Sequence, residues 1–266
     1  MVTALKTSIN ILLVFLFAAC TSVPDERMTP YVDFPETREL TARTLSLDSA
    51  LFRYPYRVRV QDDKAVVLDL HGTEYFFHAF HYPGFHYLSS FGKRGDAPEE
   101  MLSAENLRWN GNFLWTLDSN KSELTRLGFA SSGDSLLRLE AVSLDEELLR
   151  ALDFVQYDDS TFIIPDYSGD SRFCLVSRQG KLLHKIGTIP TTDEDALKNA
   201  HPALAQAWRS FIDYNPRNGV LAAVTQLGEV LEIYNLKDST HIVRIGPNGE
   251  PEFQISQGYG IPTGIM

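Results

Sequence analysis

Residues 91–118 decide the fold: Phe91-Gly-Lys-Arg-Gly-Asp-Ala-Pro-Glu-Glu100 is followed shortly by Asn112-Phe-Leu-Trp-Thr-Leu-Asp118. The first segment is rich in glycine, proline and charge, which is typical of a loop between structural units. The second segment is a short apolar run that begins at a turn, which is typical of a β-strand. We therefore expect a loop that leaves one small sheet and a hairpin that opens the next.

The same strand–turn–strand pattern recurs along the chain. It opens units at Glu105–Trp109, at Phe154–Tyr157 and at Phe211–Tyr214, each followed by a turn and a second apolar strand. The aspartates that end three of the second strands are 49 and 48 residues apart, and they are Asp69, Asp118 and Asp166. A period of roughly 40–50 residues with four strands per unit is typical of β-propeller blades. We predict an all-β fold, a β-propeller of four-stranded antiparallel blades over residues 37–266.

Residues 191–208 depart from the strand pattern. They begin with threonines and acidic residues, they are rich in Ala and Leu, and Pro202 divides them into two pieces. This composition predicts a short helical insertion between the third and fourth units. Residues 143–152 have a similar composition, which suggests another short helix.

Composition limits the classes of function. The chain of 266 residues has 24 Lys and Arg against 35 Asp and Glu, a formal net charge of −11. Such a surface repels phosphate backbones, so we expect no nucleic-acid partner. The two cysteines, Cys20 and Cys174, are too few for a metal site built on several thiolates.

The N-terminus predicts export and a lipid anchor. Lys6 precedes the apolar run Ile11–Phe17, which is too short to span a bilayer as a helix. Leu16-Phe-Ala-Ala-Cys20 resembles a bacterial lipobox, so we expect a signal peptide over residues 1–19 and a lipidated tether over residues 20–36, beginning at Cys20. With Cys20 acylated, Cys174 would have no disulfide partner in the chain. The alternative is an ordinary secretory signal that is cleaved near Ala19.

The loop between the first two units carries a resemblance to a known family. The TolB-like six-bladed β-propeller lipoproteins of Bacteroidota show a Gly-Lys-x-Gly-x-Gly-Pro-x-Glu phrase between early blades, and this chain resembles them over nearly its whole length after the signal. The matching residues are Gly92, Lys93, Gly95, Pro98 and Glu100, with Ala97 in place of a glycine. The resemblance implies a six-bladed fold and an envelope location, with an outer-membrane lipoprotein expected, but no catalytic residues. About 230 residues follow the tether, or 4.7 periods of 49, so we expect a ring that is incomplete at the C-terminus.

The repeated aspartates have two interpretations. Asp69, Asp118 and Asp166 could ring a central channel and hold a cation, since calcium prefers hard oxygen ligands. Alternatively, each carboxylate accepts hydrogen bonds from the turn after its own strand, which would explain why all three share one repeat position. We favour the turn role.

Other candidate chemistry is weaker. His71, His78, His81 and His86 fall in one unit, but His78 and His81 point to opposite faces of a strand, so we predict no metal site there. A Gly-x-Ser-x-Gly elbow is absent from the sequence, and Cys174 lies in an apolar strand. The residues of the Gly92–Glu100 loop could contact a ligand at the rim. Positive φ at its glycines and stiffness at Pro98 are a sufficient backbone explanation.

These observations favour a lipid-anchored binding or interaction module of the bacterial cell envelope. Its partners would be the membrane, through the anchor, and a glycan, peptide or protein ligand, and we predict no cofactor. The alternative is a metal-dependent hydrolase or lyase with its site in the propeller channel, so whether the protein is an enzyme stays open. No catalytic residue is predicted.

Overall fold

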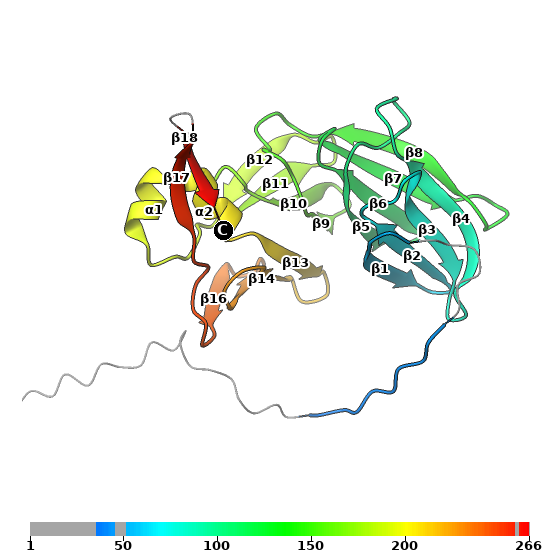
Figure 1. The fold of residues 1–266 in the computed structure, drawn as a ribbon, viewed down its shortest axis with the longest axis horizontal. Helices are drawn as coiled ribbons and strands as arrows, with labels where there is room; N and C mark the ends of the chain where they lie inside the picture. The colour runs from blue at the N-terminus through cyan, green and yellow to red at the C-terminus, as the bar shows by residue number, and fades with distance from the viewer. Residues whose placement is uncertain (1–35, 46–51, 259–260, 266) are drawn as a thin grey trace, which may run out of the picture.

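The computed structural model describes residues 36–45, 52–258 and 261–265, and these contain four four-stranded sheets, one two-stranded hairpin and two short helices. The sheets follow one another along the chain in an arc, and we number them blades 1 to 4 (Figure 1). Strands that are consecutive in sequence are neighbours in each sheet, so every blade is an antiparallel meander. This arrangement confirms the predicted class, an all-β propeller with four-stranded antiparallel blades.

The strands have the following bounds. Blade 1 comprises β1 (Pro55–Gln61), β2 (Lys64–Asp69), β3 (Tyr75–His81) and β4 (His86–Lys93). Blade 2 comprises β5 (Ala104–Asn110), β6 (Phe113–Asp118), β7 (Glu123–Phe129) and β8 (Leu136–Ser143). Blade 3 comprises β9 (Val155–Asp158), β10 (Thr161–Pro165), β11 (Phe173–Ser177) and β12 (Leu182–Ile186). Blade 4 comprises β13 (Ser210–Asn215), β14 (Val220–Thr225), β15 (Val230–Asn235) and β16 (Thr240–Ile245). The hairpin comprises β17 (Gln254–Gly258) and β18 (Ile261–Ile265).

The predicted opening hairpins are present in all four blades. In blade 2, Asn110 pairs with Phe113 across the turn, and Gly111 has a φ of +54°. Glycine adopts this left-handed conformation without the steric cost of a side chain, which is why such turns join adjacent strands. The first strands β1, β5, β9 and β13 lie nearest the centre of the arc (Figure 1).

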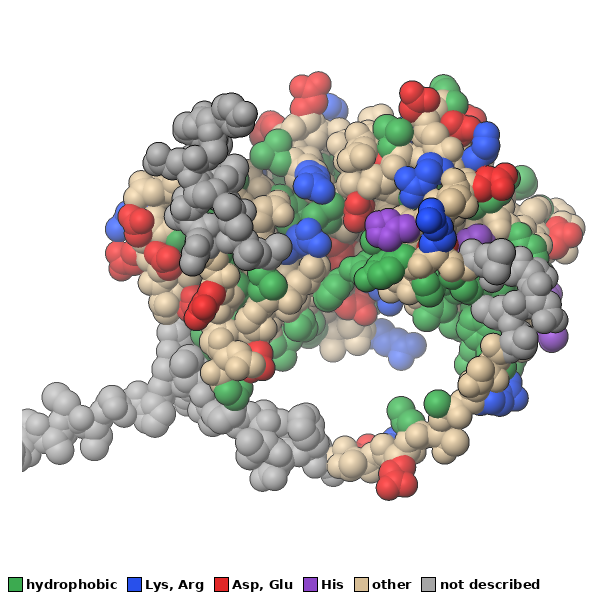
Figure 2. Space-filling view, viewed as in Figure 1, with side chains coloured by type: hydrophobic (Ala, Val, Ile, Leu, Met, Phe, Trp, Pro, Cys, Tyr) green, Lys and Arg blue, Asp and Glu red, His purple; other side chains and the backbone are tan. Residues whose placement is uncertain are grey.

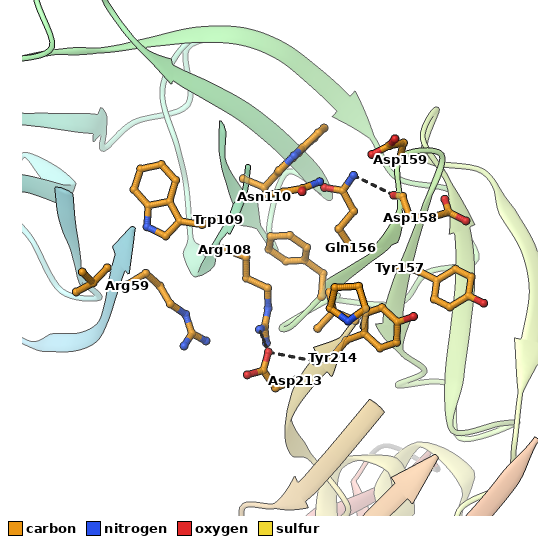
Figure 3. A pocket seen from close by; sticks show the side chains of 15 residues that line it. Arg59, Arg108, Trp109, Asn110, Gln156, Tyr157, Asp158, Asp159, Asp213 and Tyr214 are labelled. Atoms are coloured by element: carbon orange, nitrogen blue, oxygen red, sulfur yellow. Dashed lines mark hydrogen bonds and ion pairs between the residues drawn. The ribbon is translucent and has the colours of Figure 1, made fainter. Parts of the chain in front are cut away.

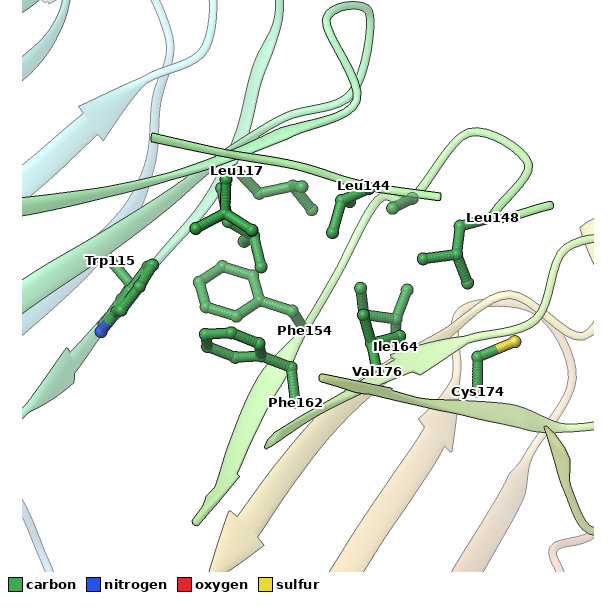
Figure 4. Packing of buried hydrophobic residues seen from close by; sticks show 12 residues of the cluster. Trp115, Leu117, Leu144, Leu148, Phe154, Phe162, Ile164, Cys174 and Val176 are labelled. Atoms are coloured by element: carbon green, nitrogen blue, oxygen red, sulfur yellow. The ribbon is translucent and has the colours of Figure 1, made fainter. Parts of the chain in front are cut away.

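Large apolar side chains between neighbouring blades hold the arc together. Between blades 2 and 3, the Trp115 ring meets the Phe162 ring edge-on, with 5.0 Å between centroids, and Phe154 packs beside them (Figure 4). All three side chains are at most 2% exposed. A four-stranded blade has two faces to cover, so its neighbours supply the burial that stabilises it.

The helical insertion is present as α1 (Glu194–Asn199) and α2 (His201–Ala207). Asp193 caps α1 by accepting hydrogen bonds from the backbone N–H groups of Asp195 and Ala196. The helices separate at Ala200, and Pro202 lies in the first turn of α2, where its missing N–H costs nothing. Trp208 follows α2 and is fully buried against blade 4, so the insertion packs on that blade.

The expected helix over residues 143–152 is wrong. The segment forms successive turns after β8, in which the backbone N–H of Asp145 donates to the Gly180 carbonyl of blade 3. Leu148 and Ala151 are buried between blades 2 and 3. Tertiary packing therefore overrides the helical propensity of this short segment.

The signal peptide, Cys20 and all but the last residue of the predicted tether lie outside the described residues. Over the part of the chain that the structure describes, no helix is both long and apolar enough to cross a bilayer. Acidic and basic side chains are interspersed on the face seen in Figure 2.

Candidate ligand-binding site

A cavity of about 380 Å³ lies at the centre of the arc, among the first strands of all four blades. Each of these strands contributes a polar side chain at an equivalent position: Arg59, Arg108, Gln156 and Asp213 (Figure 3). Each of the four is two residues before the last residue of its strand. The repeat therefore brings one equivalent position from every blade to the same cavity.

The next residue along each first strand adds an apolar wall. These residues are Val60, Trp109, Tyr157 and Tyr214. The Tyr157 and Tyr214 rings lie 5.4 Å apart between centroids, and Trp109 stacks on Phe129 at 6.2 Å. The cavity thus combines charged and amide groups with aromatic surface, a combination typical of sites for small polar ligands.

Arg108 connects three blades next to the cavity. Its Nη2 atom lies 3.1 Å from Oδ1 of Asp153, at the start of blade 3, and its Nη1 atom lies 2.8 Å from Oδ1 of Asp213 on β13. The guanidinium also donates to the backbone carbonyl of Ile212. The Arg108 side chain is 11% exposed and that of Asp153 is 5% exposed, so the ion pair between them is shielded from solvent.

Both carboxylate oxygens of Asp153 accept hydrogen bonds. The Asn106 amide of blade 2 donates to its Oδ1 atom. The backbone N–H of Phe154 donates to the same oxygen at 2.7 Å, and that of Ile212 in blade 4 donates to Oδ2 at 3.2 Å. A buried carboxylate needs such partners to offset its lost hydration. Asp153 therefore fixes the relative position of the strands that line the cavity.

Arg59 differs from Arg108 because its guanidinium has few hydrogen-bond partners and no ion-pair partner among the described residues. Its Nε atom donates to the Leu107 carbonyl over a long 3.4 Å, and within the described ranges no carboxylate oxygen lies within the 4.0 Å of an ion pair. Burial lowers the pKa of Arg59, and the positive charges of Arg108 and Arg57 lower it further. The side chain extends from β1 toward the place where Arg108 meets Asp213 (Figure 3).

Other polar atoms of the cavity wall also lack partners. In the described part of the chain, the Nε atom of Arg108, the Nε1 atom of Trp109 and the Oε1 atom of Gln156 are buried without a hydrogen bond. Unpaired buried polar atoms are uncommon in folded proteins because each costs free energy. Three of them on one cavity indicate unused hydrogen-bonding capacity.

The repeated aspartates do not line this cavity. Asp69 and Asp118 have equivalent roles, because each holds the two residues that precede the first strand of its own blade. The Asp69 carboxylate accepts from the N–H groups of Arg53 at 2.9 Å and Tyr54 at 2.6 Å. Asp118 accepts from Leu102 at 2.6 Å and Ser103 at 3.2 Å, and also from the turn after its own strand.

Asp166 serves its own turn. It accepts hydrogen bonds from the backbone and hydroxyl groups of Ser168 and Ser171, and the Lys185 Nζ atom lies 3.1 Å away. Burial raises the pKa of Asp166, but these hydrogen bonds outweigh it and leave the pKa below its usual range. All three aspartates thus have backbone partners in their own blades.

The histidines of blade 1 have separate surroundings. His78 Nδ1 lies 2.8 Å from the Ser90 hydroxyl, whereas His81 lies 3.3 Å from Asp63. Burial lowers the pKa of His78. Across residues 36–45, 52–258 and 261–265, no three His, Cys, Asp or Glu side chains are grouped as a metal site would require.

The Gly92–Glu100 loop connects blade 1 to blade 2, and its residues are held by contacts within the loop and with blade 2. Gly92 and Gly95 have φ values of +65° and +155°, and Lys93 Nζ lies 2.7 Å from Glu100 Oε1. Lys121 of blade 2 donates to the carbonyl groups of Ala97 and Glu100. None of these residues, nor Pro98, lines the cavity between the first strands.

Sequence reasoning missed the four cavity side chains Arg59, Arg108, Gln156 and Asp213. The signal was present, because each lies at the same distance before the predicted turn of its unit. The aspartates at the end of the second strand are identical residues, so their repeat is more apparent in the sequence. The cavity position carries arginine in blades 1 and 2, glutamine in blade 3 and aspartate in blade 4, so an alignment of the turns is needed to identify it.

The fold and the cavity define a β-propeller with a ligand-sized space at its centre. The sequence profile of the family described as TolB-like 6-blade propeller-like matches residues 33–266. The chain therefore belongs to this family. No match was found among the curated proteins.

The chain is also similar to solved structures at low sequence identity. A member of the DUF4221 family from Bacteroides vulgatus ATCC 8482 has a TM-score of 0.53 and 11% identity, and the match covers 80% of this chain and 66% of that one. A predicted exported protein of Bacteroides fragilis NCTC 9343 has a TM-score of 0.49 and 10% identity, with 78% and 75% covered. The chain spans just under two thirds of the first of these proteins.

Proposed function

We propose that this protein is a binding module of the bacterial cell envelope, which holds a small polar ligand in the cavity between the first strands. The observation that carries the proposal is the convergence of Arg59, Arg108, Gln156 and Asp213 on one cavity. Repeat-equivalent positions meet there, next to aromatic rings and to polar atoms without partners. Such a site can recognise a ligand through several hydrogen bonds and stacking contacts at once.

Binding is better supported than metal-dependent hydrolysis. A hydrolase of that kind would use carboxylates from several blades around one ion. The carboxylates of Asp69, Asp118 and Asp166 are occupied by backbone N–H groups in their own blades. Asp213 and Asp153, which are near the cavity, are both paired with Arg108.

The proposal places the protein at the outer membrane through acylated Cys20. Lys6, the apolar run Ile11–Phe17 and the lipobox-like Leu16–Cys20 support export followed by lipidation. The test is to express the full chain and its Cys20→Ser variant in a bacterial host and to compare their membrane fractions and intact masses. We expect diacylglycerol on the wild type alone, and accumulation of the lipidated precursor with its signal peptide uncleaved in the presence of globomycin. An unacylated wild-type protein would contradict the anchor.

The binding role is tested by screening the mature protein against sugar and peptide libraries. We expect a hit whose affinity falls about threefold to tenfold in Gln156→Ala, the usual effect of one lost hydrogen bond. Gln179→Ala is the matched control, because Gln179 is an exposed glutamine that does not line the cavity. The proposal fails if no hit is found, or if every hit binds the two variants equally well.

A further inference from the structure

The side chains that line the cavity determine which class of ligand it selects. This inference rests on the proposed binding function. Arg59 offers the strongest evidence. Its guanidinium carries five N–H donors, of which one makes a long hydrogen bond of 3.4 Å to Leu107. The side chain is half-buried, so water satisfies the remaining donors less fully than it would at the surface. A cation in this state is stabilised by an anion that enters the cavity.

Arg108 does not compete for that anion. The two terminal nitrogen atoms of its guanidinium are occupied by Asp153, Asp213 and the Ile212 carbonyl, and its unpaired Nε atom is buried. The same contacts occupy the two nearest carboxylates, so neither of them reaches Arg59. Arg59 also lines a second hollow of about 370 Å³ beside the cavity, whose lining includes Arg57. Arg57 and Arg59 on β1 form no ion pair among the described residues, and they place two positive charges on the blade 1 side, with Asp213 lining the same hollow.

The opposite side of the cavity has different chemistry. Asp158, the last residue of β9, and Asp159 after it line this side together with Gln156, whose Oε1 atom has no partner. The Oδ1 atom of Asp158 already accepts from Ser160 and Thr161, so its Oδ2 atom is the one available to a ligand. Carboxylate and amide oxygens accept hydrogen bonds from hydroxyl groups, and they repel a second negative charge. Between the two sides, Trp109 and Tyr214 provide ring surfaces. The cavity is therefore suited to one anionic group at Arg59 and hydroxyl groups toward β9.

We propose that the cavity binds an acidic sugar, in which a single carboxylate pairs with Arg59 and the hydroxyl groups face Gln156, Asp158 and Asp159. A planar carboxylate matches the fork of the guanidinium, which can donate two parallel hydrogen bonds to it. The cavity volume of about 380 Å³ suits one or two sugar rings rather than a long chain. The net charge of −11 would also repel an extended polyanion.

The experiment is isothermal titration of the mature protein with matched sugar pairs. The probes are D-glucuronate against D-glucose and D-galacturonate against D-galactose, each at low and high salt, with inorganic phosphate as a competitor. We expect at least one uronate to bind about tenfold or more tightly than its neutral partner, because the charge-assisted pair is lost in the latter. Arg59→Gln weakens the uronate more than the neutral sugar, so the preference between the two is lost.

Two further variants separate recognition from folding. Arg59→Lys keeps the charge but not the fork, so it retains part of the preference. Arg244→Gln is the matched control, because Arg244 on β16 donates to the carbonyl of its neighbour Val243 and does not line the cavity. Urea midpoints equal to that of the wild type show that each variant is folded.

The outcomes distinguish this inference from the proposed function. The acidic-sugar assignment is overturned if a uronate and its neutral partner bind equally well and Gln156→Ala weakens both. The proposed binding role is then still supported. Displacement of uronate by phosphate at equal concentration also overturns the assignment, since the site would then bind any anion. Failure of all four sugars, with a tight hit from the peptide library, overturns the assignment as well. Absence of any hit contradicts both.

Discussion

Arg108 on β5 and Asp153 before β9 form an ion pair of 3.1 Å that joins blade 2 to blade 3 beside the central cavity. The same guanidinium reaches Asp213 on blade 4, so one side chain fixes three blades relative to one another. Buried ion pairs contribute little when compared with apolar replacements, but removing one partner leaves the other charge buried and unpaired. The position of the cavity wall thus depends on a contact that is costly to break.

Removal of this contact has a predictable effect. Arg108→Ala leaves Asp153 without its cation, and we expect a loss of about 3–5 kcal/mol in the free energy of unfolding. Lys198→Ala is the control, because Lys198 forms an exposed ion pair with Glu194 on α1 and its loss costs about 0.5 kcal/mol. Urea denaturation measures both. A loss of less than about 1 kcal/mol in Arg108→Ala would show that the pair does not join the blades.

A second buried pair, Arg172 with Glu232, makes stability sensitive to acid. The two side chains are 3% and 0% exposed, and their closest atoms are 2.7 Å apart. Burial raises the pKa of Glu232, but the hydrogen bonds and charges of His241, Arg172 and Tyr234 outweigh it, so the pKa in the folded protein is below the usual value of 4.5. The resulting stability is fully present above pH 4.5 and is lost as pH falls through the lower, folded-state pKa.

The measurement is the melting temperature as a function of pH. We expect a fall in the wild type below about pH 4.5 that is weaker in Glu232→Gln, since glutamine does not titrate. This variant is also less stable at pH 7 by about 3–5 kcal/mol, because Arg172 stays buried without its anion. The exposed Glu146→Gln should follow the wild-type curve. Parallel curves for the wild type and Glu232→Gln would contradict the assignment.

Two copies of the phrase Ser-Gly-Asp-Ser provide a matched pair of glycine substitutions. Gly169 has a φ of +84°, and an added Cβ atom would lie 2.1 Å from the His201 carbonyl oxygen of α2. Gly133 has a φ of +75° but nothing within 4 Å of the same position. We expect Gly133→Ala to cost about 1–2 kcal/mol from backbone strain alone. Gly169→Ala must also displace α2, so we expect it to lower the free energy of unfolding clearly more than Gly133→Ala does. Equal losses in the two variants, measured by urea denaturation, would show that α2 moves away from the added methyl group without cost.

Cys174 should be unreactive in the folded protein. The side chain is 1% exposed between blades 2 and 3, and burial raises the pKa of the thiol to about 12. The thiolate is the reactive form, so native protein at pH 8 should not be labelled by a maleimide, whereas urea-unfolded protein should be labelled at Cys174. Mass spectrometry of the labelled peptide provides the readout. Rapid labelling in native buffer would show that the interface between blades 2 and 3 opens.

The sequence was sufficient to predict the β-propeller architecture, because each blade is formed by strands that are consecutive along the chain. Turns such as Asn110–Asn112 and apolar runs such as Phe113–Asp118 determine the hairpins, and the repeat of Asp118 at Asp69 and Asp166 determines the period. The insertion was equally predictable, since helix-start residues and the proline at Pro202 act through nearest neighbours, although the capping residue is Asp193 and not one of the threonines before it. Propensity failed only in residues 143–152, where contacts with blade 3 decide the conformation.

The cavity was harder to predict because its residues meet only in three dimensions. Arg108 and Asp213 are 105 residues apart, and no local rule indicates that they form an ion pair. The unpaired state of Arg59 depends on what Arg108 already binds, which is a property of the assembled arc. The aspartates at 69, 118 and 166 drew attention as possible cation ligands, but their partners are backbone N–H groups in their own blades.

The central claim is that ligand binds in the cavity between the first strands. Its most direct test is a crystal structure of the mature protein with the tightest hit of the sugar and peptide screen. The account predicts ligand density that contacts Arg59 on β1, Gln156 on β9 and Tyr214 on β13. Density at any other surface, with this cavity empty at a saturating ligand concentration, would contradict it.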